Sequence, residues 1–280
     1  MSVKLDEIGY WSELKLEIIQ KYAAAYSRIL NGQVRLKHIY IDAFCGAGIH
    51  KSRASGNLVH GSPTVALGID PPFCEYHFID LNRRKIGVLK SLIEEDSRCT
   101  YDPEKVFLYN KDCNDVLITD VFPRARYEDY HRALCLLDPY GLHLDWKVIY
   151  IAGQMKSIDL FLNFPIGDMN RNVLLRDQTK TNPDQLNRMT KYWGDESWRQ
   201  SAYSSEGDLF GYKEKLTNRA VVKDFKRRLQ IVAGFSYVPE PMPMRNSRGV
   251  EIYYLFFASQ NKTGLKIVKD IFNKYRDRRS

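Results

Sequence analysis

Five short apolar segments alternate with helical patterns between residues 36 and 164. An apolar segment followed by an amphipathic one, repeated, is typical of strands joined by helical crossovers. Segments that are apolar at nearly every position favour parallel strands buried on both faces, with right-handed crossovers. The predicted strands are "LKHIYID" (36–42), "EYHFID" (75–80), "VFLYN" (106–110), "RALCLLD" (132–138) and "SIDLFLNF" (157–164).

The helices between these strands carry ordinary start signals. "SPTVALGI" has Ser62 as the expected N-cap and Pro63 in the first turn. A longer helix follows over 82–95, a short one through Val116 and Val121, and another from about Asp145 to Gly153. Together with the strands, they predict an α/β protein with a mostly parallel sheet.

The flanking segments extend this arrangement. Residues 11–30 have apolar side chains at helical spacing, with Ser12 as a candidate cap and Asn31-Gly32 as the end. Residues 165–218 are polar and predict a mainly helical insertion, followed by a helix over 218–234. A hairpin over 235–244 and 249–259 and a basic helix over 263–276 end the chain. We expect one domain over 1–280, with an N-terminal helix (1–32), this insertion, and a C-terminal hairpin and helix (235–280).

Composition narrows the function only a little. The chain has 280 residues and a formal charge of +8, which fits a polyanionic partner such as nucleic acid but is also found in many enzymes that bind none. No cysteine lies in a CxxC or Cys/His pattern with zinc spacing, so we expect reduced thiols and no metal. The N-terminus is charged and no apolar run could span a membrane, so we expect a cytoplasmic protein. The cysteines are Cys45, Cys74, Cys99, Cys113 and Cys135.

A polar residue stands at or just after the end of every predicted strand. In an open parallel sheet, ligands bind outside the carboxyl ends of the strands. Each such residue alone is more often a helix cap or part of a turn than a ligand-binding residue. Their succession along the sheet favours a ligand site. The residues are Asp42, Asp80, Asp112, Asp138 and Asn163.

A cofactor that carries adenosine gives these residues specific roles. Gly46 and Gly48 would let the backbone pass close to the ligand, with its N–H groups facing a carboxylate. Asp42 would hold this loop or meet an ammonium group. Asp80 would accept hydrogen bonds from two ribose hydroxyls. Asp112 would accept from the adenine amino group, and the Cys113 N–H would donate to the ring.

The loop "IDAFCGAGIHK" lacks the features of phosphate-binding loops. It has no third glycine running into a helix, and the chain has no Walker lysine pattern. A cofactor without phosphates, S-adenosylmethionine (SAM), fits better. "IDAFCGAG", with Phe44 between Asp42 and Gly46, resembles the first motif of class I SAM-dependent methyltransferases. The C-terminal hairpin also resembles their Rossmann-like fold, which has seven strands, the last of them antiparallel.

"LLDPYG" (136–141) resembles the D-P-P-Y motif of enzymes that methylate exocyclic amines of bases, without the second proline. The resemblance implies that Asp138 and the Pro139 carbonyl accept from the target amine, while Tyr140 stacks on the base. A simple Asp-Pro turn is the alternative. No Pro-Cys pair is present, which argues against methylation of cytosine C5 by a cysteine nucleophile.

The insertion offers candidate substrate contacts. "NFPIGDMNRN" places Asn163, Asp168, Asn170 and Arg171 near the expected mouth of the site. Two tryptophans five residues apart suit packing of the insertion better than stacking on bases. They are Trp193 and Trp198. Basic clusters at 83–85, 226–228 and 274–279 could contact phosphates or form solvated faces.

The order of these motifs along the chain resembles the three-Cys-motif partner proteins (TcmP). The segments that show this resemblance are "WSELKLEIIQKYAAAY", "YIDAFCGAG", "GSPTVAL", "FIDLNRRK", "LLDPYGLHLDW", "DLFLNFPIGDMNRN" and "YWGDESWR". The resemblance implies a methyltransferase-like fold in bacteria beside a small partner that carries the three-cysteine motif. It does not imply a particular reaction.

The sequence therefore predicts a SAM-dependent methyltransferase that acts on nucleic acid. A catalytically silent scaffold of the same fold is the alternative. A nucleotide-binding oxidoreductase of NAD type is the weaker one.

Overall fold

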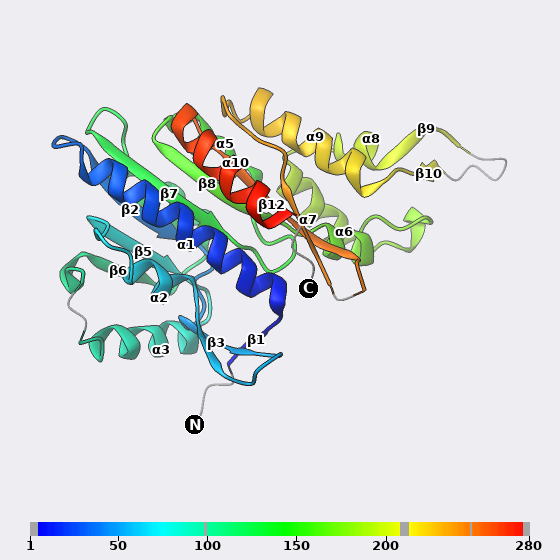
Figure 1. Ribbon diagram of the computed structural model, residues 1–280. Coiled ribbons are helices and arrows are strands. Elements are labelled where there is room, and N and C mark those ends of the chain that lie inside the picture. Colours follow the sequence, from blue (N-terminus) through cyan, green and yellow to red (C-terminus); the bar gives the residue numbers. More distant parts are fainter. Residues whose placement is uncertain (1–4, 98–99, 208–212, 247, 277–280) are drawn as a thin grey trace.

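The computed structural model describes residues 5–97, 100–207, 213–246 and 248–276. Its main sheet has seven strands in the order β11-β12-β8-β7-β2-β5-β6 (Figure 1). The pairs among β2, β5, β6, β7 and β8 are parallel, whereas β12 is antiparallel to β8 and β11. This is the strand order of the class I methyltransferase fold, with its antiparallel C-terminal hairpin. The strands are β2 (Lys37–Asp42), β5 (Glu75–Ile79), β6 (Val106–Tyr109), β7 (His131–Leu137), β8 (Ile158–Phe164), β11 (Met242–Arg245) and β12 (Glu251–Ala258).

The five predicted parallel strands are confirmed to within one residue at each end. The hairpin strand predicted to begin at 235 begins later, at Met242. Pro239 and Pro241 precede it, and proline has no N–H for a strand ladder. Only an isolated bridge between Tyr237 and Ser259 extends the pairing upstream among the described residues.

Helices cover both faces of the sheet. On one face, α1 and α10 lie side by side and α2 and α3 continue the layer (Figure 1). Tyr40, Leu134 and Phe161 point into the core beneath them. The neighbouring strand residues Ile41 and Cys135 point into the opposite core, since successive side chains of a strand face opposite sides. That layer contains α4, α5, α7 and α9. The bounds are α1 (Tyr10–Asn31), α2 (Ser62–Leu67), α3 (Arg83–Glu94), α4 (Cys113–Val116), α5 (Trp146–Met155), α7 (Pro183–Trp193), α9 (Asn218–Ile231) and α10 (Lys262–Arg276).

Two predicted helix caps are wrong. Gly9, in extended conformation, precedes α1, which begins two residues before Ser12. Gly61 precedes α2, so Ser62 is already helical. Glycine also serves at this position. The Ser62 hydroxyl is therefore available to the Asp42 carboxyl, whose pKa is raised by burial, and it opposes this rise.

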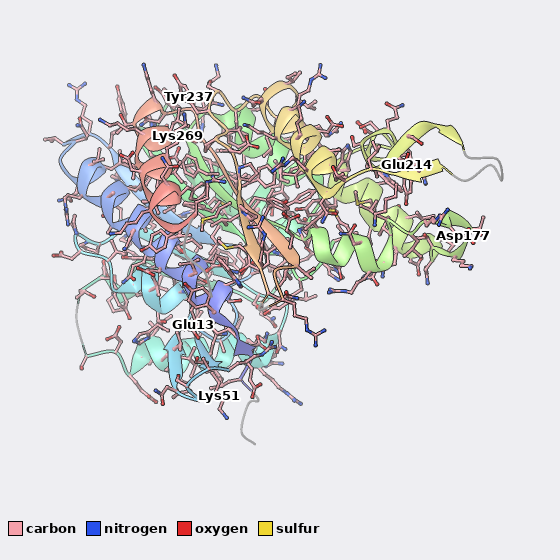
Figure 2. All side chains as sticks on the ribbon, turned by 45° about the vertical axis from the view of Figure 1, so that its right-hand side comes forward. Glu13, Lys51, Asp177, Glu214, Tyr237 and Lys269 are labelled. Atoms are coloured by element: carbon pink, nitrogen blue, oxygen red, sulfur yellow. The ribbon has the colours of Figure 1, made fainter. Side chains whose placement is uncertain are left out.

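The insertion is helical with a small hairpin at its tip. α6, α7 and α8 lead into β9 and β10, and Figure 2 shows Asp177 and Glu214 of this region projecting away from the sheet. Trp193 and Trp198 are fully buried, and their indole N–H groups donate to Ser197 and Thr190. Both tryptophans pack the insertion. Its further elements are α6 (Ile166–Asn172), η4 (Gln178–Lys180), α8 (Trp198–Ala202), β9 (Tyr203–Gly207) and β10 (Lys213–Lys215). The short 3₁₀- and π-helical segments outside the insertion are η1 (Pro103–Lys105), η2 (Leu117–Val121) and η3 (Phe122–Arg124).

Residues 49–61, for which the sequence predicted no helix or strand, form part of a second sheet. β3 (Ile49–Ser52) and β4 (Leu58–His60) make a hairpin, and the N-terminal strand β1 (Glu7–Ile8) pairs parallel with β3. The short, mostly polar strands lack the apolar alternation that identifies a strand in sequence. The β1–β3 pairing fixes the N-terminal segment beside the loop that contains Gly46 and Gly48, which we call the glycine loop.

The described parts of the chain contain no helix long and apolar enough to cross a lipid bilayer. Cys45, Cys74, Cys113 and Cys135 are free thiols, as expected. Cys99 lies outside the described residues.

Candidate functional site

The glycine loop follows β2 and is held by backbone hydrogen bonds. The Ala43 N–H donates to the Leu136 carbonyl at 3.0 Å, and the Cys45 N–H donates to the Ile79 carbonyl at 3.0 Å. Gly46 has φ +65°, and a Cβ there would meet no atom within 4 Å. The backbone of Gly46 therefore borders open space at the carboxyl edge of the sheet.

Gly48 serves a different purpose. It has φ +76°, and a Cβ would lie 2.7 Å from Leu89 Cδ1 in α3. Its carbonyl accepts hydrogen bonds from the Gly61 N–H at 2.7 Å and the Thr64 hydroxyl at 2.6 Å. Gly48 thus lets the loop approach α2 and α3 closely.

We expect Gly48→Ala to lower the free energy of unfolding by about 1–3 kcal/mol, because a positive φ and a displaced Leu89 both cost energy. Urea denaturation measures this. Gly87→Ala is a matched control, since Gly87 lies in α3 with nothing near its missing Cβ and alanine there should stabilise. Equal stability of Gly48→Ala and the native protein would contradict the packing role.

A first cavity, of about 380 Å³, opens at the carboxyl ends of β2, β5 and β6. We call it the outer cavity. It brings together four of the predicted cofactor residues, which are Phe44, Asp80, Asp112 and Cys113. Residues that the sequence did not indicate complete the wall, among them Lys111, Asn114, His143, Asp145, Arg188 and Lys191.

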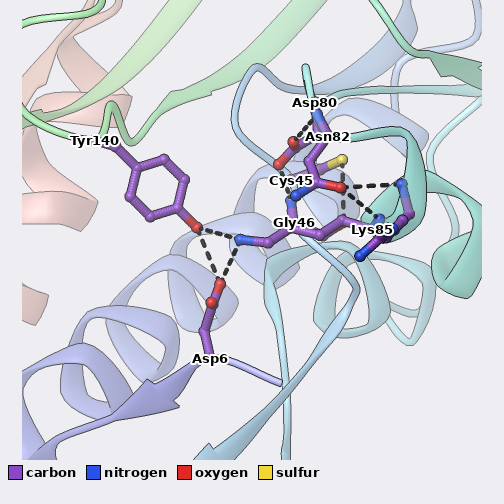
Figure 3. A network of polar contacts seen from close by, with 8 residues as sticks. Asp6, Cys45, Gly46, Asp80, Asn82, Lys85 and Tyr140 are labelled. Atoms are coloured by element: carbon purple, nitrogen blue, oxygen red, sulfur yellow. Dashed lines mark hydrogen bonds and ion pairs between the residues drawn. The ribbon is translucent and has the colours of Figure 1, made fainter. Parts of the chain in front are cut away.

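Asp80 joins the glycine loop to the start of α3. Its Oδ2 accepts from the Gly46 N–H at 3.0 Å, and its Oδ1 accepts from the Asn82 N–H at 2.7 Å (Figure 3). The side chain is buried at the edge of the outer cavity. A carboxylate has about four lone-pair sites, so Asp80 keeps acceptor capacity beyond these two bonds.

Asp112 and Cys113 lie at the start of α4. The Asp112 side chain is exposed and accepts from the Asn114 N–H at 2.8 Å, so it caps the helix as well as lining the outer cavity. Cys113 is buried, and burial raises the pKa of its thiol to about 12. The thiol therefore stays protonated at neutral pH and offers no nucleophile.

A second cavity, of about 260 Å³, adjoins the first. We call it the inner cavity. Gly46, Asp138, Pro139 and Asn163 line it. Phe44 and Tyr140 line both cavities and so stand at their junction. The structure thus places the predicted acceptor motif and Gly46 at two cavities that share two wall residues.

Lys15 of α1, which the sequence did not indicate, reaches into the inner cavity. Its Nζ forms an ion pair with Asp138 Oδ2, and the two side chains are 9% and 27% exposed. Burial by itself would lower the pKa of Lys15, but attraction to Asp138 and Asp42 raises it above its ordinary value. Lys15 is therefore a buried cation whose partner is the residue expected to receive the acceptor.

Asp42 is fully buried at the end of β2. Burial raises the pKa of its carboxyl to about 7, although hydrogen bonds from Ser62 and the Phe44 N–H oppose the shift. The Phe44 N–H donates to Oδ1 at 3.3 Å. Asp42 thus holds the loop, as one of its two predicted roles requires, and it does not line either cavity.

This raised pKa makes stability depend on pH. Between pH about 4 and about 7 the folded protein keeps a proton on Asp42 that the unfolded chain releases. The free energy of unfolding should fall as pH rises through this window and then level off. A pKa difference of about three units corresponds to at most about 4 kcal/mol in the free energy of unfolding.

Asp42→Asn should therefore stabilise the protein at pH 8 more than at pH 4.5, as measured by urea denaturation. The exposed Asp129→Asn is the control, and an equal pH slope in Asp42→Asn would refute the assignment.

The N-terminal segment is tied across the junction of the two cavities. Lys85 Nζ donates to Asp6 Oδ2 at 2.6 Å and to the Tyr140 hydroxyl at 3.1 Å (Figure 3). The Tyr140 hydroxyl also donates to Asp6 at 3.2 Å. Lys85, predicted as a phosphate contact or a solvated residue, instead has this local partner. Asp6 could not be found from sequence, because β1 is too short to carry a pattern.

Asn163 is the penultimate residue of β8 and lines the inner cavity. Its side chain is buried, and Oδ1 has no hydrogen-bond partner among the described residues. A buried acceptor without a partner costs energy unless a ligand or water supplies a donor. Asn163 is thus suited to bind an N–H group.

The other predicted substrate residues lie on α6 and line neither cavity. Asp168 Oδ1 accepts from Asn172 at 2.9 Å and pairs with Arg171 at 3.5 Å. Asn170 donates to Asn218 at 2.9 Å. A Cβ on Gly141 would come within 2.7 Å of Asp168 Oδ2, so Asp168 packs against the turn after Tyr140. The side chains of Asp168, Asn170 and Arg171 therefore support this turn and the insertion, and a role in substrate binding stays a prediction.

The remaining wall of the outer cavity comes from the insertion, from α4 and from the segment between β7 and α5. Arg188 and Lys191 project from α7, and Arg188 lies 3.4 Å from His143. Asn114 donates to the His143 carbonyl at 3.2 Å and accepts from the Asp145 N–H at 2.8 Å. No group of His, Cys, Asp and Glu side chains among the described residues could hold a metal ion.

Comparison with known proteins gives matches in structure alone. No protein-family model and no curated protein sequence matches the chain. A protein of Legionella pneumophila is similar in structure, with 9% identity, a TM-score of 0.53, and coverage of 94% of this chain and 92% of that one.

Two methyltransferases are more distantly similar. The methyltransferase domain of bacterial CtHen1 has 12% identity and a TM-score of 0.42, with 86% of this chain and 99% of that one covered. The glycopeptide N-methyltransferase MtfA, solved with SAM, has 12% identity and a TM-score of 0.36, with 85% and 87% covered. At 9% identity, the match to the Legionella pneumophila protein concerns the fold alone. The resemblance to three-Cys-motif partner proteins has no counterpart among these proteins and stays a prediction.

Proposed function

We propose that this protein is a SAM-dependent methyltransferase. The observation that carries the proposal is the pair of adjoining cavities at the carboxyl edge of the sheet, where the Asp80 carboxylate meets the bare backbone of Gly46. Their volumes fall in or near the range of small-molecule sites, about 300–1,000 Å³. The ligand would place its nucleoside in the outer cavity and its amino-acid part in the inner one.

The residues present fit this group. Asp80 retains acceptor capacity for ribose hydroxyls, Asp112 and Cys113 border the space for the base, and Asn163 offers an unused acceptor. When bound, SAM supplies a methyl group on a sulfonium, which a nucleophile takes in one displacement. The chain's own contribution would be to hold the two reactants in line.

The loop geometry disfavours a dinucleotide cofactor. After Gly48 the chain enters the β3–β4 hairpin, and α2 begins only at Ser62. No helix N-terminus therefore follows the glycines directly to receive a pyrophosphate. This arrangement argues against the oxidoreductase alternative.

For the acceptor we propose nucleic acid, with an exocyclic base amine as the target. Asp138 and the Pro139 carbonyl would accept from the amine and offset the positive charge that grows on it. Tyr140 is 58% exposed at the junction of the cavities and can stack on a base. The net charge of +8 favours a polyanion. The resemblance further suggests that a three-Cys-motif protein assists as partner.

One observation favours a second candidate, a methyltransferase-fold protein that binds SAM and a partner without transferring methyl groups. Asp138 is already paired with Lys15. If this pair is permanent, the ammonium of Lys15 offsets the negative charge of Asp138, which then stabilises an acceptor amine less well.

The test has two stages. Calorimetry with S-adenosylhomocysteine asks whether the cavity binds the cofactor's product. Transfer of a labelled methyl group from SAM to DNA, RNA and protein pools, with and without the three-Cys-motif protein, then asks for activity. Label in nucleic acid supports the full proposal. Binding without label in any pool supports the second candidate, and no binding contradicts both.

A further inference from the structure

The inner cavity has an unusual distribution of charge. Asp6, Glu7 and Asp138 supply carboxylates, and Asp42 lies close enough to influence Lys15 electrostatically. Lys15 is the one lysine or arginine among the described residues that line this cavity. It is buried, and its Nζ lies 5.5 Å from the centre of the Tyr253 ring. A buried lysine is stable only while an anion faces it.

The wall of the inner cavity is complementary to a zwitterion. Asn163 Oδ1 needs an N–H donor, which an ammonium group supplies. Lys15 needs an anion, which an α-carboxylate supplies. An amino-acid group carries both charges and is neutral overall, so it can enter without upsetting the charge balance of the wall.

We propose that the inner cavity is an α-amino-acid subsite in which Lys15 exchanges its ion-pair partner, from Asp138 in the free protein to the ligand's α-carboxylate in the complex. The proposal rests on the proposed function, since the amino acid would be that of SAM. It removes the conflict between the Lys15–Asp138 pair and an acceptor role for Asp138. Once Lys15 turns to the ligand, Asp138 is free to receive the acceptor.

Lysine suits such an exchange. Its ammonium is a point charge with three donors on a flexible stem, so it can change partner by rotation of side-chain bonds. Lys15 and Asp138 both face the same cavity, and Lys15 sits on α1, whose backbone need not move. The exchange makes binding ordered, with the amino-acid-bearing cofactor before the acceptor.

The decisive experiment compares two ligands that share a nucleoside. S-adenosylhomocysteine carries the α-amino acid, and 5′-methylthioadenosine lacks it. Calorimetry gives the ratio of their affinities for the native protein, for Lys15→Met and for Lys15→Arg. A charge-assisted hydrogen bond corresponds to about 10- to 100-fold in affinity.

We expect Lys15→Met to lose this factor for S-adenosylhomocysteine while 5′-methylthioadenosine binds as before. Lys15→Arg, which keeps the charge, should recover most of the ratio. Should Lys15→Met fold poorly because Asp138 is left unpaired, the double variant Lys15→Met/Asp138→Asn removes both charges and must show the same loss. If the ratio of the two affinities is unchanged in Lys15→Met or in the double variant, the proposal is overturned.

Asp138→Asn tests the exchange itself. If Asp138 competes with the ligand for Lys15, the variant should bind S-adenosylhomocysteine several-fold more tightly. Weakening as large as that of Lys15→Met would show that Asp138 holds the ligand and would overturn the exchange. Failure of both ligands to bind the native protein would overturn the proposed function as well, and so differs from failure of the exchange alone.

Discussion

Asp80→Ala is expected to reduce the affinity for S-adenosylhomocysteine by at least about 100-fold. Two hydrogen bonds from ribose hydroxyls to a carboxylate contribute about 1.5–3 kcal/mol each, and both would be lost. The Gly46 N–H would also lose the acceptor that now holds it at 3.0 Å, so the loop would no longer be fixed under the ligand. Calorimetric titration of the native protein and the variant measures the effect.

The control for this change is Asp129→Ala. Asp129 has an exposed side chain that pairs with Arg126 and lines neither cavity, so its loss should leave the affinity unchanged. Circular dichroism should show that both variants fold. If a folded Asp80→Ala bound the ligand within a few-fold of the native protein, Asp80 would be only a helix and loop cap.

The second large effect is expected for Asp138→Asn. Methyl transfer should fall by about 100- to 1,000-fold, the usual loss when one group that stabilises charge in the transition state is removed. Binding of S-adenosylhomocysteine should be at least as tight as in the native protein, because Asp138 would contact the acceptor and not the cofactor. The measurement compares single-turnover transfer of a labelled methyl group with calorimetry on the same preparation.

Asparagine is chosen because its carbonyl can still accept from Lys15. Alanine would leave the Lys15 ammonium buried without a partner and would cost about 3–5 kcal/mol of stability. Asp168→Asn serves as the comparison, since Asp168 supports the same loop from α6 without lining a cavity. Equal loss of binding and transfer in Asp138→Asn would refute an acceptor role.

The parallel sheet was predictable because its strands are buried on both faces. Segments such as 132–138 and 157–164 are apolar at nearly every position. Elements that depend on tertiary contacts were not predictable. The β1–β3 pairing joins two short polar segments, and the start of α1 depends on the extended conformation of Gly9.

The residues of the candidate site also include some that the sequence predicted and some that it did not. Asp80, Asp112 and Asp138 could be predicted as site residues because ligands bind at the carboxyl ends of parallel strands. The strand ends were predictable from the sequence, and each of the three residues lines one of the two cavities. Lys15 could not be predicted as a site residue, because a lysine on an amphipathic helix is ordinarily solvated. Only the packing of α1 in the folded protein buries Lys15. Asp168, Asn170 and Arg171 were expected at the mouth because they follow β8, but α6 turns their side chains toward the insertion and the turn at Gly141.

A crystal structure of the protein with S-adenosylhomocysteine tests the central claim most directly. We expect the ribose hydroxyls on Asp80, the adenine beside Asp112 and Cys113, and the amino acid beside Gly46 and Lys15. A ligand bound elsewhere, or crystals that stay free of ligand at saturating concentration, would contradict the assignment of these cavities to the cofactor.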